Sequence, residues 1–207
     1  MHVALRAALA LAILVPLTAP ATAQTRAKLD PDWPCQQIKT PTFSLAAVWA
    51  GPELDLNSQS WRNEPDVAEL KAQMARRRVP VADVEKAIVD FKAKAGPDGD
   101  AKLLRAFAAA FEDLSEQRSQ VIDGLDRFGR RQNALADRIR AENEAVEKAS
   151  DQKADSAAPP DAGSQDKLLW DIRIYDDRRQ TASYVCEVPT LIEQRIGKIA
   201  RAVQSAL

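Results

Sequence analysis

The chain has 207 residues, of which 29 are basic and 30 acidic, and only 5% are aromatic. Its net charge is therefore −1, and residues of both signs are interspersed along the chain. This mixed, near-neutral charge argues against a nucleic-acid-binding protein and against a polyanionic tail. Its richness in alanine, glutamate, arginine and leucine is typical of long helices.

The first 23 residues have the pattern of a secretory signal peptide. Arg6 precedes the apolar run "AALALAILVPL", and the segment closes on the small residues "ATA". This pattern predicts cleavage between Ala23 and Gln24, and a periplasmic or secreted protein without a membrane span. An uncleaved N-terminal anchor is the alternative, but the apolar run is short, is interrupted by Pro16 and is soon followed by Pro20.

Two cysteines, Cys35 and Cys186, remain after cleavage, whereas the single histidine, His2, is removed. A pair of thiols in an oxidising compartment normally forms a disulfide, so we expect a structural Cys35–Cys186 bond rather than a free reactive thiol. A mature chain without histidine lacks the base of Ser-His and Cys-His catalysis and the commonest transition-metal ligand. We therefore expect no catalytic residues, no metal site and no cofactor.

Residues 24–62 are expected to be irregular. Pro31, Pro34, Pro41 and Pro52 are too closely spaced for a long helix, although "SLAAVW" suits one short helical turn. The prediction is an extended segment that depends on the rest of the chain for its position.

Residues 63–97 predict two short helices. The first begins around Pro65, the second follows Pro80, and "GPDGD" at 96–100 ends it. Both carry apolar residues three and four positions apart, which is the spacing of one helix face. These residues are Val67, Leu70 and Met74 in the first helix, and Val81, Val84, Ile88 and Phe91 in the second.

A heptad pattern beginning at Leu104 is the strongest signal in the chain. Its positions are Leu104, Phe107, Phe111, Leu114, Arg118, Val121, Leu125, Phe128, Gln132, Leu135, Ile139, Glu142 and Val146. The pattern predicts a coiled-coil helix over about 100–148, roughly 70 Å long at 1.5 Å per residue. One long helix in a globular bundle is the alternative. The polar residues Arg118, Gln132 and Glu142 would specify the register of pairing.

Residues 149–165, "ASDQKADSAAPPDAGSQ", predict a flexible turn, and 166–207 predict a returning helix. We expect a bend at Pro189 and a restart in which Thr190 and Glu193 form a capping box. A β-hairpin within 168–188 stays open as an alternative, because "LWDIRIY" and "TASYVCEV" also alternate with a period of two.

The returning helix has a second apolar stripe, which implies a second packing partner. Its residues are Trp170, Ile174, Thr181 and Val185. We expect the N-terminal segment and the two short helices to cover this stripe.

An antiparallel hairpin places Cys186 level with Phe128, between Gly124 and Gly129. A glycine inside a helix costs about 1 kcal/mol relative to alanine. One reason to keep it is close approach of another backbone, and Cys35 would bring the N-terminal segment to this level. The alternative is that both glycines are merely tolerated.

The predicted fold is all-α. It is an elongated antiparallel coiled-coil-like helical hairpin over 98–207, with two short helices and an irregular N-terminal segment strapped on by a disulfide. Because residues 166–207 match the long helix in length, a monomer is favoured over a dimer formed through the heptad seam.

The stretches "WPCQQ" and "YVCEVPTLIEQR" resemble small exported bacterial proteins of unknown function. The resemblance covers about 20 residues around the two cysteines. It implies export, and it brings no activity or site residue with it.

The preferred function is an exported, non-enzymatic scaffold or adaptor that binds another envelope protein. Trp33 is expected to be buried beside the disulfide, whereas Trp49 and Trp61 are candidate partner-binding residues, since recognition residues often lie on irregular segments held by a rigid scaffold. A periplasmic holdase-type chaperone is an alternative. An envelope enzyme that uses paired carboxylates is another; the pairs are Glu112 with Asp113, Asp176 with Asp177, and Asp66 with Glu69.

Overall fold

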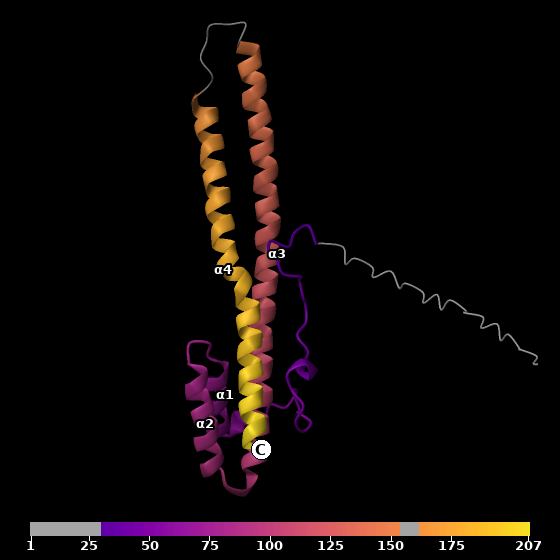
Figure 1. The fold of residues 1–207 in the computed structure, drawn as a ribbon, viewed down its shortest axis with the longest axis vertical. Coiled ribbons are helices and arrows are strands. Elements are labelled where there is room, and N and C mark those ends of the chain that lie inside the picture. The colour runs from indigo at the N-terminus through magenta and orange to yellow at the C-terminus, as the bar shows by residue number, and fades with distance from the viewer. Residues whose placement is uncertain (1–29, 154–161) are drawn as a thin grey trace, which may run out of the picture.

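The structure is a computed structural model that describes residues 30–153 and 162–207. Two long antiparallel helices pack together, and two shorter helices lie beside the end that carries the C-terminus (Figure 1). The helices are α1 (Pro65–Ala75), α2 (Val81–Lys94), α3 (Gly99–Lys153) and α4 (Ala162–Ala206). The predicted all-α hairpin with two short helices and a disulfide-linked N-terminal region is confirmed.

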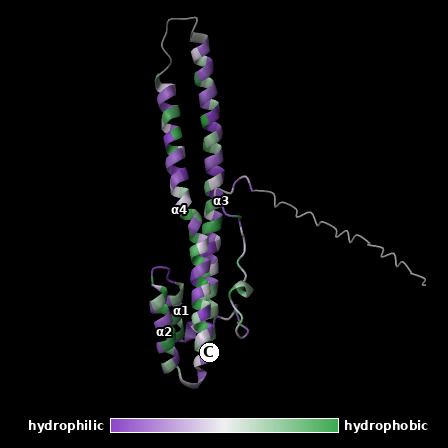
Figure 2. Cartoon of the chain, in the orientation of Figure 1, coloured by the Kyte–Doolittle hydropathy of each residue, from purple (hydrophilic) through white to green (hydrophobic). Residues whose placement is uncertain are grey.

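The hydrophobic core lies where α1 and α2 cover the hairpin. Phe107, Phe111 and Leu114 of α3 are buried there against apolar residues of the other three helices. Residues 106–111 of α3 are all buried, because α3 is surrounded in this part of the molecule. Apolar residues accordingly gather at this end in Figure 2. Burial of this kind supplies most of the favourable free energy of folding, at about 25 cal/mol per Å².

Beyond this core, α3 and α4 bury a narrower seam that includes Leu125, Leu135 and Ala182. The polar seam residues contact α4 of the same chain. Gln132 Nε2 donates to the backbone oxygen of Tyr175 at 3.3 Å, and the other two seam residues form ion pairs, Arg118 with Glu193 and Glu142 with Lys167. The heptad seam is therefore occupied within the chain.

Helix α4 is continuous across Pro189, so the predicted restart at Thr190 with its capping box is wrong. Packing of Ile192 and Ile196 into the core holds the helix together on the C-terminal side of the proline. The axis of α4 nevertheless changes direction partway along (Figure 1). Such a bend is expected where a proline ring displaces the carbonyl four residues earlier.

The β-hairpin alternative for 168–188 is wrong, because these residues are helical. The predicted turn at 149–165 is too long on both sides, since α3 continues to Lys153 and α4 begins at Ala162. The centre of that turn and the signal peptide at 1–23, with its cleavage site, lie outside the described residues.

The second apolar stripe of α4 is not covered by α1 and α2, and this expectation is wrong. Trp170 remains 60% exposed and Val185 40% exposed. The reason is the short connection between α2 and α3, which spans only residues 95–98. Because α2 is 14 residues, or about 21 Å, long, it reaches only the C-terminal part of α4.

Gly129 and Gly124 have different surroundings, although both lie inside α3. A Cβ added at Gly129 would clash with the backbone oxygen of Asp32, so the N-terminal segment crosses α3 at this glycine. A Cβ at Gly124 would meet only the end of the Arg127 side chain, at 3.9 Å. The close-approach interpretation is confirmed for Gly129, and Gly124 is merely tolerated.

Gly129→Ala is therefore expected to lower the free energy of unfolding by about 2 kcal/mol, because backbone must move to admit the methyl group. Gly124→Ala is the matched control and is expected to raise it by about 1 kcal/mol through helix propensity. Urea denaturation followed by circular dichroism measures both. Changes of the same sign would contradict the crossing at Gly129.

Candidate functional site

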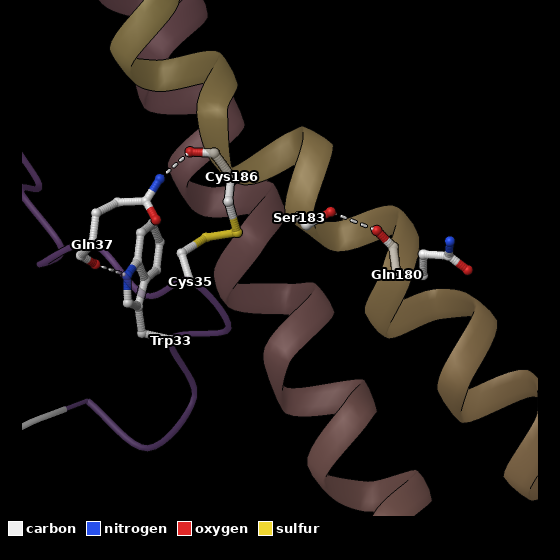
Figure 3. Close-up of a disulfide and its surroundings, with 6 residues drawn as sticks. All are labelled: Trp33, Cys35, Gln37, Gln180, Ser183 and Cys186. Carbon is white, nitrogen blue, oxygen red and sulfur yellow. Dashed lines mark hydrogen bonds between the residues drawn. A yellow bond between two sulfur atoms is a disulfide. The ribbon is translucent and has the colours of Figure 1, made fainter.

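The Cys35–Cys186 disulfide ties the N-terminal segment to α4, with an S–S distance of 2.01 Å and a Cα–Cα distance of 5.6 Å. The bond joins residues 151 positions apart, which confirms the predicted pairing. Figure 3 shows Cys35 on the segment and Cys186 on the side of α4 that faces it. This covalent link suits an oxidising compartment.

Hydrogen bonds organise the segment around the disulfide. The Gln37 side chain donates from Nε2 to the backbone oxygen of Cys186, three residues before Pro189 (Figure 3). The Trp33 indole Nε1 donates to the backbone oxygen of Gln37 at 2.7 Å. Trp33 is half-buried, not fully buried as expected, because it lines a cavity beside this loop.

A cavity of about 590 Å³ lies between this loop and the two long helices. Its lining includes Trp33, Gln132, Tyr175 and Arg179. Gln132 is only 8% exposed, and its Oε1 has no hydrogen-bond partner. An unpaired buried acceptor is costly unless something donates to it.

Lys39 is the next attachment point. Its ammonium contacts Asp126 of α3 and Asp30 of the N-terminal segment, each at 2.8 Å. The two hydrogen bonds, first to Asp126 and then to Asp30, raise the pKa of Lys39. The same contact with Lys39 is the main cause that lowers the pKa of Asp30. Lys39 thus remains charged and holds the segment against α3.

Arg118 is the buried centre of the same attachment, with only 2% of its surface exposed. Its Nε donates to Glu193 Oε1 at 2.6 Å, which links α3 to α4. Its terminal nitrogens donate to the backbone oxygens of Thr40 at 2.6 Å and Pro41 at 3.2 Å. The sequence predicted a register role for Arg118, but not its contacts with the N-terminal segment.

Arg195 has a comparable role at α1 that the sequence did not reveal. This buried guanidinium donates to the backbone oxygens of Gln73, Met74 and Val79. It thereby binds the carbonyl end of α1, where a cation is favoured by the helix dipole. Burial lowers the pKa of Arg195. In the sequence, the only sign of this role is that Arg195 lies on the apolar helix face with Ile192, Ile196 and Ile199.

The candidate partner-binding residues, Trp49 and Trp61, are both half-buried and pack against the hydrophobic core. The ring of Trp49 lies 4.8 Å from that of Phe107, and its Nε1 donates to the backbone oxygen of Pro52 at 2.7 Å. Trp61 lies under two cations, with Lys71 Nζ 4.5 Å and Arg62 Cζ 5.1 Å from the ring centroid. Both rings therefore dock the segment and also contribute to its outer surface.

The paired carboxylates lie on the helices, Asp66 with Glu69 on α1 and Glu112 with Asp113 on α3. Burial first, and then the neighbouring Asp113, raise the pKa of Glu112, while Asp113 itself pairs with Lys71. Asp66 pairs with Lys102 at 2.8 Å, and this hydrogen bond is the main cause of its lowered pKa. Asp113 and Asp66 are thus each paired with a lysine, and the charged form of Glu112 is disfavoured.

The remaining acidic pair, Asp176 and Asp177, is exposed on α4. Among the described residues, no group of three or more His, Cys, Asp or Glu side chains is placed to hold a metal ion. None of the helices within 30–153 and 162–207 has the length and hydropathy needed to cross a bilayer.

Comparisons with protein-family models, with curated proteins and with solved structures found no match to this chain.

Proposed function

We propose that the chain is an exported, non-enzymatic scaffold or adaptor that acts by binding another protein of the cell envelope. The observation that carries this proposal is the N-terminal segment from Asp30 to Asn63. It runs along a rigid hairpin with only two short 3₁₀ turns, at Leu45–Ala47 and Ser60–Asn63. Irregular backbone held on a rigid support is the usual place for recognition residues.

The disulfide and the predicted signal peptide both support a location outside the cytoplasm. The disulfide requires oxidising conditions to form, and the predicted signal peptide would deliver the chain to them. The resulting mature protein is periplasmic or secreted.

Trp61 is the better of the two candidate contacts. The ring of Trp49 packs against that of the core residue Phe107, with the two planes tilted by 32°, so its substitution also removes core packing. Trp61 instead lies beside Arg62 and Lys71, which give its surroundings both an aromatic and a cationic character. Partly exposed tryptophan and arginine are the residue types that most often dominate binding energy.

Trp61→Ala is expected to weaken capture of the partner by about 2 kcal/mol while leaving the helical content unchanged. In-cell crosslinking identifies the partner, and titration of the purified pair measures the affinity. Ile38→Ala, at a side chain that is 82% exposed on the same segment, is the matched control and is expected to leave binding unchanged. Loss of helical content in Trp61→Ala, or unaltered capture, would assign Trp61 to the core alone.

A holdase-type chaperone is the second candidate. It is favoured by the large apolar side chains that α4 exposes, among them Trp170, Tyr184 and Leu191. Exposed apolar surface of this kind is what a holdase needs to bind unfolded clients. Suppression of the aggregation of an unfolded client by the purified protein would favour this candidate over the adaptor.

A further inference from the structure

A strip of large apolar residues lies open on α4. Trp170 is 60% exposed, Tyr184 69% and Leu191 57%. These residues and Asp177 follow one another at intervals of seven, so they lie along one face of the helix. The strip from Trp170 to Leu191 is about 32 Å long at 1.5 Å per residue. Figure 2 shows hydrophobic and hydrophilic residues alternating along this part of α4.

Further toward the C-terminus, the surface of α4 next to this strip is covered. One turn beyond Leu191, Arg195 is buried and donates to the backbone oxygens of Met74 and Val79. The α1–α2 connection thus lies at the end of the covered part of α4, and the strip begins next to it. Figure 1 shows α4 extending well past the end of the α1–α2 pair. The strip therefore adjoins, without a partner among the described residues, the surface of α4 on which the α1–α2 connection lies.

Positive charge is concentrated where the covered part ends. Arg76, Arg77 and Arg78 follow α1, and all three are exposed. Within the described part of the chain, none of them forms an ion pair. An uncompensated cluster of three guanidinium groups beside an apolar strip is complementary to a ligand that is both apolar and acidic.

We propose that the strip from Trp170 to Leu191 docks an amphipathic α-helix of a partner protein, with acidic residues of that helix at Arg76–Arg78. A helix matches the straight, seven-residue spacing of the strip, and about 21 residues match its length. Asp177, in the middle of the strip, selects a basic residue opposite it and so defines the register. This inference rests on the proposed adaptor function and names a partner surface distinct from Trp61.

The test uses two synthetic 22-residue helical peptides with leucine at the first and fourth positions of each heptad. One carries glutamate at the polar positions, apart from a single lysine opposite Asp177, and the other carries lysine at all of them. Binding of each labelled peptide to the full mature protein is measured by fluorescence anisotropy at low and high salt. The acidic peptide is expected to bind more tightly, and salt should weaken its binding because screening reduces charge attraction.

Two triple variants distinguish the effect of the arginine cluster on peptide binding from the effect of net charge. Substitution of glutamine for Arg76, Arg77 and Arg78 is expected to weaken binding of the acidic peptide about tenfold. The matched control replaces Arg127, Arg130 and Arg131, which are exposed on α3, and changes the net charge equally. It is expected to change binding by less than about twofold.

Trp170→Ala and Tyr184→Ala test the strip itself and are each expected to weaken the acidic peptide about tenfold with unchanged helical content. Equal binding of the two peptides, equal effects of the two triple variants, or no effect of Trp170→Ala would overturn the proposal. A dimer in sedimentation that Trp170→Ala dissociates would also overturn it, by assigning the strip to a second copy.

Trp61→Ala distinguishes the two proposals, because it is expected to leave peptide binding unchanged. If the acidic peptide binds but Trp61→Ala leaves partner capture unchanged, the Trp61 site is rejected and the strip is kept. If Trp61→Ala weakens partner capture but the acidic peptide does not bind, the strip is rejected and the adaptor function is kept.

Discussion

Replacing Cys35 and Cys186 by serine is expected to lower the free energy of unfolding by up to about 5 kcal/mol. The bond closes a loop between residues 151 positions apart, and loop closure restricts the unfolded chain more strongly as the loop lengthens. The N-terminal segment then relies on Lys39, Arg118 and its tryptophans for attachment. Its release should open the crossing at Gly129 before the hairpin unfolds.

Denaturation of the oxidised protein and the double serine variant by urea measures the difference, with hydrogen exchange reporting on residues 30–40. Reduction of the wild-type disulfide should reproduce the effect of the double variant. Unchanged stability together with unchanged exchange would show that the other contacts hold the segment without the bond. A non-reduced digest in which both thiols can be alkylated would contradict the bond itself.

Arg118→Met is expected to destabilise the protein by about 3 kcal/mol. The methionine fits an aliphatic side chain into the seam, but it leaves Glu193 without its cation and the backbone oxygens of Thr40 and Pro41 without donors. Arg118→Lys should recover only part of the loss, because an ammonium cannot reproduce the planar fork of a guanidinium. Thermal or urea unfolding measures both variants.

Arg127→Met is the matched control, since Arg127 is exposed on the same helix and forms no ion pair within the described residues. It is expected to change stability by less than about 0.5 kcal/mol. Equal stability of the Arg118→Met and wild-type proteins would mean that the buried ion pair contributes register rather than stability.

Local and periodic features of the chain could be predicted. The heptad pattern from Leu104 onward predicted α3, because a helix with one continuous apolar face must bury it against a partner. Counting residues back from the turn placed Cys186 near Phe128, and the structure places Cys186, Phe128 and Gly129 around one cavity. The predicted restart of the helix at Thr190 failed because tertiary packing of Ile192 and Ile196 outweighs the local preference of a proline.

The functional surfaces were less accessible to such reasoning. Trp49 and Trp61 are recognisable in the sequence as tryptophans of an irregular segment, but their packing against the core depends on contacts far apart in the sequence. The apolar stripe that includes Trp170 and Val185 predicts a covered face, whereas both residues are exposed. Such a stripe indicates that a helix has a partner, but not whether the partner belongs to the same chain.

The sequence by itself determined the helical class, the antiparallel pairing of two long helices and the partner of each cysteine, since these follow from periodicity, length and the even number of thiols. Only the tertiary structure decided where α1 and α2 pack. The four-residue connection at 95–98 holds them at the start of α3, and Arg195 anchors the end of α1. It also decided that Arg118 joins three segments and that the face from Trp170 to Leu191 stays open. The physical reason is that these outcomes depend on which surfaces remain after the short helices have packed, and no local pattern records that competition.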